Sequence, residues 1–246
     1  APFAGLRKLL PDLSAFAQSP FKLRVGDTVD LDQMLEKMTA LGYERVERVE
    51  KPGEMSVRGG IIDVYPLISP FPYRIELFDV EIDSIRTFDP EDQRSKDRLT
   101  EAEITPCREI VFDSKRFQNA SQHASELLQE QLAKMSDRQA KKKLEETIGH
   151  ELFLLRQGSW FSGISKYISL IYPERKTLFD YVPQDSLLVI DEPSRLLETA
   201  RQIERDEAEW MTNALADGKT LPAFVMAKSY DSLLFRKPFP TLYLSL

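Results

Sequence analysis

Residues 50–95 read EKPGEMSVRGGIIDVYPLISPFPYRIELFDVEIDSIRTFDPEDQRS, and this stretch decides the fold around it. Apolar side chains alternate with others through its middle, over Tyr73, Arg74, Ile75, Glu76, Leu77 and Phe78. Because successive side chains of a strand point to opposite faces, one face of this strand is apolar and can cover a core. The other face carries a cation, a carboxylate and an aromatic ring in a row. Such a row is typical of a recognition surface, where the ring supplies contact area and the charges fix register.

The same row has a second interpretation, because isolated apolar residues are common on protein surfaces. Phe78 could lie at the strand end and tuck under a neighbouring loop. Arg74 and Glu76 could then be ordinary solvent-exposed charges. The periodicity by itself favours this second interpretation, so the recognition surface needs support from elsewhere in the sequence.

The sequence on both sides of this strand predicts a small α+β unit over residues 21–111. Asp30 is typical of a helix N-cap, and Gly42 of a helix end, so a helix is expected over residues 31–41. The expected strands cover residues 21–25, 43–49, 56–65, 73–78, 82–88 and 99–111. The prolines within residues 66–72 indicate a loop. Together these segments predict a mostly antiparallel sheet with at least one helix.

The pair Gly59-Gly60 interrupts the strand expected over residues 56–65. Two glycines inside a strand indicate a bulge or the close approach of another backbone. A phosphate-binding loop is disfavoured, because such a loop leads into a helix, whereas the sequence after Gly60 stays extended.

The remaining sequence predicts an N-terminal helix and linker of a flanking domain over residues 1–20. It also predicts a helix-rich α/β domain with a degenerate nucleotide-binding-like strand over residues 112–246. Helices are expected over residues 114–148 and 194–215, a buried parallel strand over 186–192, and a last strand over 241–246. An aromatic cluster is expected to form core between helices, and consists of Phe153, Trp160, Phe161, Tyr167 and Tyr172. The predicted fold class is therefore α+β, with a small antiparallel domain joined to an α/β domain whose sheet needs further sequence to be complete.

Composition indicates a soluble globular protein: 42% of the 246 residues are hydrophobic and 30% are charged. No apolar run is long enough for a membrane span, and no signal peptide opens the chain. A single cysteine suits a reducing compartment, so we expect a cytoplasmic protein that binds no membrane. The chain starts at Ala1 without Met and ends on an apolar run, so we expect a segment of a longer protein.

No combination of residues predicts a catalytic or metal site. Cys107 follows Thr105-Pro106 in strand-like sequence and is interpreted as a small core residue rather than a nucleophile. His123 and His150 lie far apart in helical sequence and, with one cysteine, do not make a zinc-binding set.

The net charge of −7 lies entirely in residues 21–110, which hold 13 Lys and Arg against 20 Asp and Glu. An acidic surface opposes non-specific binding to a phosphate backbone. A protein partner with basic or mixed charge is therefore favoured over nucleic acid.

Two other functions have some support in the sequence. The run SLLVIDE, ending in Asp191 and Glu192, resembles a nucleotide-binding strand whose aspartate holds magnesium, but the sequence has no matching phosphate-binding loop of the form GxxxxGK[ST]. A structural remnant is therefore favoured over a nucleotide hydrolase. The basic run 141–143 is interpreted as a solvated helix face balanced by Glu145 and Glu146, with a DNA-binding patch as the alternative.

The segments GEMSVRGGIIDVYP (53–66) and PYRIELFDVEIDSIRTFDPEDQRS (72–95) resemble the N-terminal UvrB-homology region of the bacterial transcription-repair coupling factors. The resemblance extends to APFAGLRKLLP (1–11), KTLFDYVPQDSLLVIDEPSR (176–195) and ERDEAEW (204–210). The ending DEPSR, in place of the DESH motif of UvrB, favours the coupling factors.

This resemblance implies a fold like domain 2 of UvrB and a docking platform that recruits UvrA after the full protein has displaced stalled RNA polymerase. It places the UvrA contacts at Arg58, Arg74, Glu76 and Phe78. Both arginines would pair with carboxylates of UvrA, Phe78 would fill an apolar depression, and Glu76 would fix register.

The resemblance also implies what this segment lacks. The motor that uses ATP and magnesium, and the parts that bind RNA polymerase and DNA, would lie outside this chain. We therefore expect no enzymatic activity, no cofactor and no metal in the segment itself.

Overall fold

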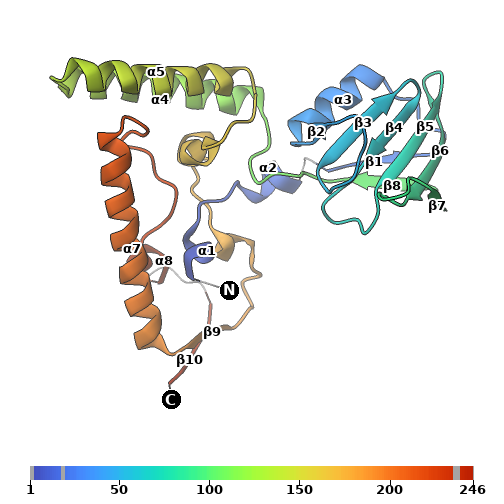
Figure 1. Cartoon of the computed structure of the whole chain (residues 1–246). Helices are drawn as coiled ribbons and strands as arrows, with labels where there is room; N and C mark the ends of the chain where they lie inside the picture. Colours follow the sequence, from blue (N-terminus) through green and yellow to red (C-terminus); the bar gives the residue numbers. More distant parts are fainter. Residues whose placement is uncertain (1–2, 18–19, 235–238, 246) are drawn as a thin grey trace. The chain divides into compact units, whose positions relative to one another are not determined.

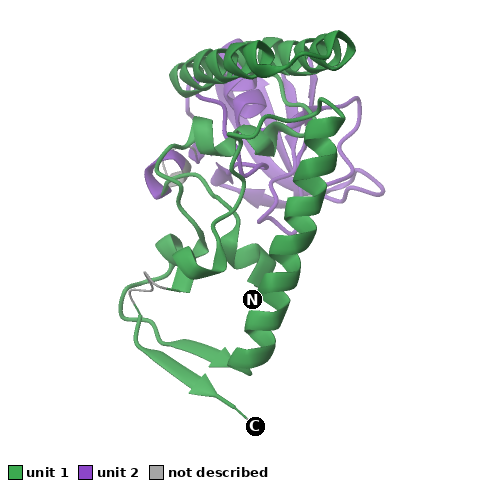
Figure 2. Ribbon diagram, turned by 90° about the vertical axis from the view of Figure 1, so that its left-hand side faces the viewer, with its two compact units in different colours: residues 1–12, 114–246 green, residues 13–113 purple. Residues whose placement is uncertain are grey.

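The computed structural model describes residues 3–17, 20–234 and 239–245, and the chain forms two compact units. Unit 2 is Leu13–Asp113, and unit 1 combines Ala1–Asp12 with Ser114–Leu246, as the two colours of Figure 2 show. The predicted domain division at residues 1–20, 21–111 and 112–246 stays a prediction. Unit 2 is thus inserted into the sequence of unit 1.

Unit 2 contains a six-stranded sheet of order β2-β3-β4-β5-β6-β7, in which β2 and β3 are parallel and the other pairs antiparallel. Strands β1 and β8 form a separate antiparallel pair. Its elements are α2 (Leu13–Ala17), β1 (Phe21–Arg24), α3 (Leu31–Ala40), β2 (Glu44–Arg45), β3 (Glu54–Arg58), β4 (Ile61–Val64), β5 (Tyr73–Phe78), β6 (Glu81–Phe88), β7 (Ser95–Leu99) and β8 (Glu101–Ile104). Figure 1 shows α3 lying beside the sheet.

The helix α3 and the sheet share one hydrophobic core. Asp30 caps the helix by accepting a bond from the Gln33 backbone N–H at 3.0 Å, as the sequence predicts. Gly42 follows the helix with φ +93°, a left-handed conformation that glycine adopts without strain. Met38 of α3 and Ile75 of β5 are both fully buried in this core. Since Tyr73 and Leu77 also pack against the core, the predicted alternation along β5 is confirmed.

The two glycines form the turn between β3 and β4 rather than an interruption within one strand. Gly59 has φ +59°. The carbonyl of Gly60 accepts a 2.7 Å bond from the Leu77 backbone N–H, and a Cβ atom on Gly60 would lie 2.9 Å from the Leu77 carbonyl oxygen. The predicted close approach of another backbone is therefore confirmed, whereas the single strand over residues 56–65 is wrong.

Two other predicted strands are shorter than expected. In residues 43–49 the backbone ladder stops after Val46, because the Glu47 carbonyl accepts its bond from the Ser56 hydroxyl instead of a backbone N–H. The strand expected over residues 99–111 is split, since β7 stays in the large sheet while β8 leaves it to pair with β1.

Unit 1 is mainly helical, and its only regular sheet within the described residues is a parallel pair, β9 with β10. Its elements are α1 (Phe3–Arg7), α4 (Ser114–Lys134), α5 (Arg138–Arg156), η1 (Ile164–Tyr167), α6 (Ile168–Ile171), η2 (Leu178–Tyr181), β9 (Leu188–Asp191), α7 (Pro193–Ala216), α8 (Tyr230–Leu234) and β10 (Thr241–Leu244). The mixture of a mostly antiparallel sheet with a helical region confirms the α+β class.

The predicted aromatic cluster is only partly core. Phe161, Tyr167 and Tyr172 are buried, but Phe153 and Trp160 expose 57% and 54% of their surface. Phe153 is exposed because α5 turns by about 100° per residue and buries its neighbour Leu152 instead. The prediction is therefore wrong for these two residues.

The strand predicted over residues 186–192 is parallel to its neighbour, as expected, but it is not buried as a whole. Ile190 packs inward, while Leu187 and Val189 are exposed. A two-stranded sheet has too little cover for both faces of β9. Leu246, at the end of the last predicted strand, lies outside the described residues. Among the described helices, none is both long enough and apolar enough to cross a membrane.

Candidate docking face

The sheet of unit 2 has one face against the core and one face turned away from it. Strand register places Asp63 opposite Arg74 and Arg74 opposite Arg86, while Glu76 lies between Ile61 and Ser84. We call the face turned away from the core the outer face. It consists of Arg58 on β3, Ile61 and Asp63 on β4, Arg74, Glu76 and Phe78 on β5, and Ser84 and Arg86 on β6. All four residues predicted to contact a partner lie on this face, and their role as contacts stays a prediction.

Phe78 is the most exposed part of the outer face. It is the last residue of β5, and 80% of its surface is accessible. The tight turn that follows contains Asp79, with φ +57°, and Val80, which is also exposed. The interpretation in which the ring tucks under a loop is therefore wrong.

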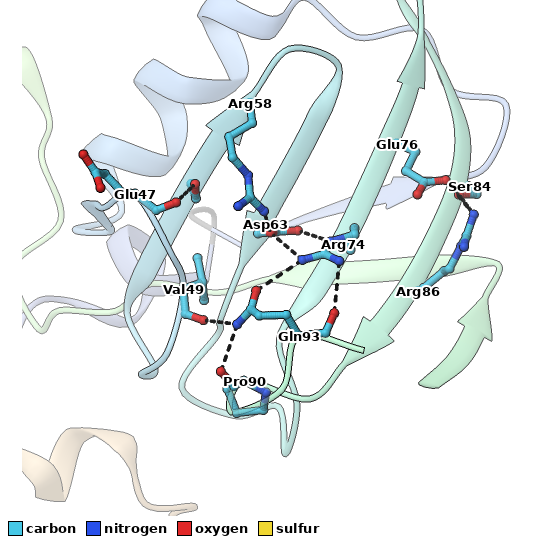
Figure 3. A network of polar contacts seen from close by, with 11 residues as sticks. Glu47, Val49, Arg58, Asp63, Arg74, Glu76, Ser84, Arg86, Pro90 and Gln93 are labelled. Atoms are coloured by element: carbon cyan, nitrogen blue, oxygen red, sulfur yellow. Dashed lines mark hydrogen bonds and ion pairs between the residues drawn. The ribbon is translucent and has the colours of Figure 1, made fainter. Parts of the chain in front are cut away.

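A buried carboxylate lies at the centre of the outer face. The side chain of Asp63 is 1% exposed and accepts three bonds from two guanidinium groups, as Figure 3 shows. Arg74 donates from Nε to Oδ1 at 2.7 Å and from Nη2 to Oδ2 at 2.9 Å. Arg58 donates from Nη2 to Oδ2 at 2.7 Å. The bidentate pair with Arg74 has the geometry in which a guanidinium binds a carboxylate most strongly.

Arg74 is held from three sides, and its side chain is only 16% exposed. Its guanidinium lies over the ring of Phe88 at 4.4 Å and donates to the backbone and side-chain oxygens of Gln93, both at 3.3 Å. The hydrogen bond to Asp63 raises the pKa of Arg74 above its ordinary value, although burial acts in the opposite direction. Arg74 is thus part of a fixed network rather than a free surface cation.

Gln93 closes this network from the loop after β6. Its backbone has φ +64°, an uncommon conformation for a residue with a side chain. The side-chain amide donates to the carbonyl of Val49 at 3.1 Å and of Pro90 at 2.9 Å. These bonds leave the amide oxygen directed at Arg74 (Figure 3).

Arg58 and Glu76 present more surface than the groups at the centre. The Arg58 side chain is 51% exposed, so part of its guanidinium faces solvent while one nitrogen holds Asp63. Glu76 is partly exposed, and its Oε2 accepts from the Ser84 hydroxyl and from Arg86 Nη2, both at 2.6 Å. The outer face therefore offers an aromatic ring, a half-exposed cation and a tethered carboxylate.

Sequence reasoning missed Asp63, Arg86 and Gln93. Asp63 had a signal, because it is the one charged residue in the apolar run IIDV of β4. Its partners could not be identified without the strand register, which depends on the turns at Gly59-Gly60 and Asp79-Val80. Gln93 lies in a loop and has no pattern that marks it.

The other candidate sites show only ordinary contacts. Glu192 has φ +46° and pairs with Arg195 at 3.0 Å. Lys142 pairs with Glu146 at 3.7 Å along the exposed side of α5, which agrees with a solvated helix face. Burial raises the pKa of the Cys107 thiol, which disfavours the nucleophilic thiolate. Within the described ranges, no group of three or more His, Cys, Asp or Glu side chains is placed to hold a metal ion.

Comparison with known proteins gives two findings. Residues 21–109 match the family described as the UvrB interaction domain. The whole chain is similar to transcription-repair-coupling factors, with 38% identity over 246 residues to that of Bacillus subtilis (strain 168) and 34% over 249 residues to that of Staphylococcus haemolyticus (strain JCSC1435). Both alignments cover 100% of this chain and 21% of the relative, so the chain spans about a fifth of the length of the curated relatives it matches.

Proposed function

Because this chain corresponds from end to end to a segment of the transcription-repair-coupling factor family, we propose that unit 2 is a docking module that recruits UvrA. Through this contact the protein would link stalled transcription to nucleotide excision repair. The single observation that supports the proposal best is the position of Phe78. An aromatic ring stands almost fully in solvent on an ordered sheet face, and the same face carries a half-exposed arginine two strands away, inside the matched residues 21–109.

The outer face combines an exposed aromatic ring with charged side chains, a composition typical of protein interfaces. Burying a phenylalanine side chain that was in water contributes about 1.5–3 kcal/mol. Arg58 keeps guanidinium N–H groups available for a carboxylate of UvrA, and Glu76 would reject a partner that brings a negative charge to the same place. Phe78 and Arg58 are accordingly the two principal contacts.

The role that we propose for Arg74 differs from the direct pairing with a UvrA carboxylate that the resemblance implies. Its guanidinium already binds Asp63 and Gln93. A carboxylate of UvrA would have to compete with Asp63 for the same N–H groups. We therefore assign Arg74 to the proposed site through its internal pairing, with at most an edge of the side chain against UvrA.

The rest of the proposed activity belongs to the longer protein. The similarity to coupling factors supports a parent that binds RNA polymerase and DNA and uses ATP and magnesium through parts beyond this segment. For the segment itself we propose protein binding without catalysis.

Calorimetric titration of this chain with purified UvrA tests the proposal. Phe78→Ala and Arg58→Ala should each weaken binding by about 1–3 kcal/mol, which is roughly a 5- to 150-fold increase in Kd. Phe78 is 80% exposed, so its replacement should not lower the melting temperature. Arg58→Ala removes one of the two guanidinium partners of buried Asp63, so it should lower the melting temperature while the protein stays folded.

Ile68→Ala is the matched control. Ile68 is an apolar residue with 71% of its surface exposed, and it lies in the loop between β4 and β5 rather than on the outer face. Its replacement should leave Kd unchanged. Folded Phe78→Ala and Arg58→Ala proteins with wild-type affinity for UvrA would refute the proposal.

A further inference from the structure

The carboxylate of Asp63 is buried, unlike the exposed side chains of the outer face, and the presence of a charge at a buried position needs an explanation. A carboxylate removed from water is costly unless it is paired and hydrogen-bonded, and a well-packed apolar residue at such a position would often stabilise the fold as well. Asp63 is 1% exposed and uses both oxygens to bind guanidinium groups on two different strands. Its contacts therefore point to a role in holding those groups.

We propose that Asp63 is a positioning residue of the outer face, which fixes the guanidinium of Arg58 in the orientation that UvrA binds. In this arrangement Arg74 serves the face by holding Asp63 rather than by meeting the partner. The inference rests on the proposed function, since it concerns the same face and the same partner.

The contacts of the two arginines differ in the way this division of roles requires. Arg74 makes the bidentate pair with Asp63, lies over Phe88 and is clamped by Gln93, which leaves its side chain mostly buried. Arg58 makes one bond to the same carboxylate and leaves half of its side chain in solvent. Arg74 is therefore held inside the network, whereas Arg58 has a guanidinium that a partner can reach.

The benefit of this arrangement lies in side-chain entropy and in charge. An arginine that is already held in its bound orientation loses less rotamer freedom when the partner arrives. The charge of Asp63 is balanced by Arg74, so the charge of Arg58 remains available to a carboxylate of UvrA. A free arginine at the same position would have the charge without the orientation.

The change Asp63→Asn distinguishes positioning from simple charge. If the arginines acted only through charge, removing a carboxylate beside them would make the face more positive and would strengthen binding to an acidic site. If Asp63 positions Arg58, the same change weakens binding. Asparagine has one acceptor oxygen in place of the two that accept the three guanidinium bonds, and its NH2 group faces a guanidinium donor, so the network cannot keep all of its bonds. We expect UvrA to bind about tenfold more weakly to Asp63→Asn.

The experiment measures Kd for UvrA with the whole 246-residue chain, its Arg58→Ala and Asp63→Asn variants and the double variant. Asp63→Asn should weaken binding in the wild-type background and have little further effect once Arg58 is alanine. Failure of the wild-type chain to bind UvrA would refute the proposed function. A wild-type chain that binds, with Asp63→Asn equally tight or tighter, would overturn only the inference about Asp63.

Two controls separate positioning from loss of fold. Ile62→Val changes a fully buried neighbour on β4 whose side chain faces the core, so it lowers stability without touching the network and should leave Kd unchanged. Equal weakening by Ile62→Val would assign the Asp63 effect to general destabilisation and overturn the inference.

Gln93→Asn acts on the network from the exposed loop and decides the question if Asp63→Asn does not fold. Asparagine tolerates the positive φ of Gln93, but its shorter side chain cannot reach both Arg74 and the Val49 carbonyl. We expect Kd for UvrA to rise about threefold with an unchanged melting temperature. A folded Gln93→Asn protein with wild-type affinity would count against the network as a positioning device.

Discussion

Phe78 and Asp63 lie on the same face of one sheet, but they have opposite relations to water. The ring of Phe78 is solvated at a strand end, where a partner can cover it and gain the free energy of burial. The carboxylate of Asp63 has already lost its water and gained two guanidinium groups in exchange. One residue is suited to supply affinity, and the other to supply geometry.

The close approach of the Leu77 backbone to Gly60 predicts the effect of adding a single methyl group at Gly60. Gly60→Ala would place Cβ 2.9 Å from the carbonyl oxygen of Leu77, and backbone cannot yield as a flexible side chain can. We expect unit 2 to lose about 1–3 kcal/mol of unfolding free energy, measured by chemical denaturation.

Gly149→Ala is the control for this prediction. Gly149 lies inside α5, and nothing within 4 Å would meet its added Cβ atom. The same methyl group should therefore stabilise unit 1 by about 0.5–1 kcal/mol, through the higher helix propensity of alanine. A Gly60→Ala protein as stable as the wild type would show that the Leu77 carbonyl can move away.

For individual residues, the sequence indicated which side chains share the outer face, but not which of them form hydrogen bonds with one another. Alternation along β5 is a local property, so Arg74, Glu76 and Phe78 could be placed together from the sequence. The pairing of Arg74 with Asp63 depends on residues 11 positions apart meeting across two strands. The pairing of these two residues depends on the register of β4 against β5, which the loop between the strands sets. No local sequence pattern predicts that register.

Helices and strands were predicted best where a cap or a periodic pattern decides them. Helix α3 begins after Asp30 and ends before Gly42, as these residues predict. The strands that differed from expectation are those limited by long-range partners. Strand β8 leaves the large sheet because β1, about 80 positions earlier in the chain, provides its ladder.

The short helix η2 carries a titratable cap, which makes its stability depend on pH. Asp180 accepts bonds from the backbone N–H of Thr177 at 2.7 Å and from its hydroxyl at 3.2 Å. Burial alone would raise the pKa of Asp180, but these bonds and Lys176 outweigh burial and lower the pKa. The carboxylate therefore stabilises the fold most above pH of about 4, and its contribution is lost as the pH falls through the lowered pKa.

We expect Asp180→Ala to reduce the unfolding free energy of unit 1 by about 1 kcal/mol at pH 7, and by less at pH 3, where the wild-type carboxylate begins to be protonated. Denaturant unfolding at the two pH values measures the difference. Asp185→Ala, which removes an exposed carboxylate nearby, is the control for loss of a surface charge and should leave the unfolding free energy at pH 7 almost unchanged. An Asp180→Ala deficit that stays constant between pH 7 and pH 3 would contradict the role of the charge.

Each of the two units has fully buried side chains of its own. In the part of the chain that the structure describes, the core cluster with Met38 and Ile75 lies in unit 2, whereas the fully buried Ile148 belongs to unit 1. Composition and pattern predicted the α+β class. They could not predict that residues 1–12 fold with unit 1, because that association is made by bonds such as Leu9 N–H to the Met226 carbonyl at 2.9 Å.

Separate cores predict separate unfolding transitions. Ile75→Ala and Ile148→Ala each empty a fully buried site and should each cost about 2–5 kcal/mol, but only in their own unit. Both tryptophans, Trp160 and Trp210, belong to unit 1, so their fluorescence reports that unit alone while calorimetry reports both. Ile75→Ala should lower the midpoint of the calorimetric transition of unit 2 and leave the midpoint seen by tryptophan fluorescence, which reports unit 1, unchanged. A fluorescence midpoint lowered equally by both changes would show that the units unfold together.

The polypeptide passes between the two units twice, because residues 13–113 leave unit 1 after Asp12 and return to it at Ser114. A protease that nicks only one of these crossings leaves both bodies covalently tethered through the other, and two cuts are needed to release a free fragment. By the same topology, a recombination event with two splice points can exchange the entire inserted unit, and with it the proposed docking face, while the remaining unit keeps its own helices in their original order.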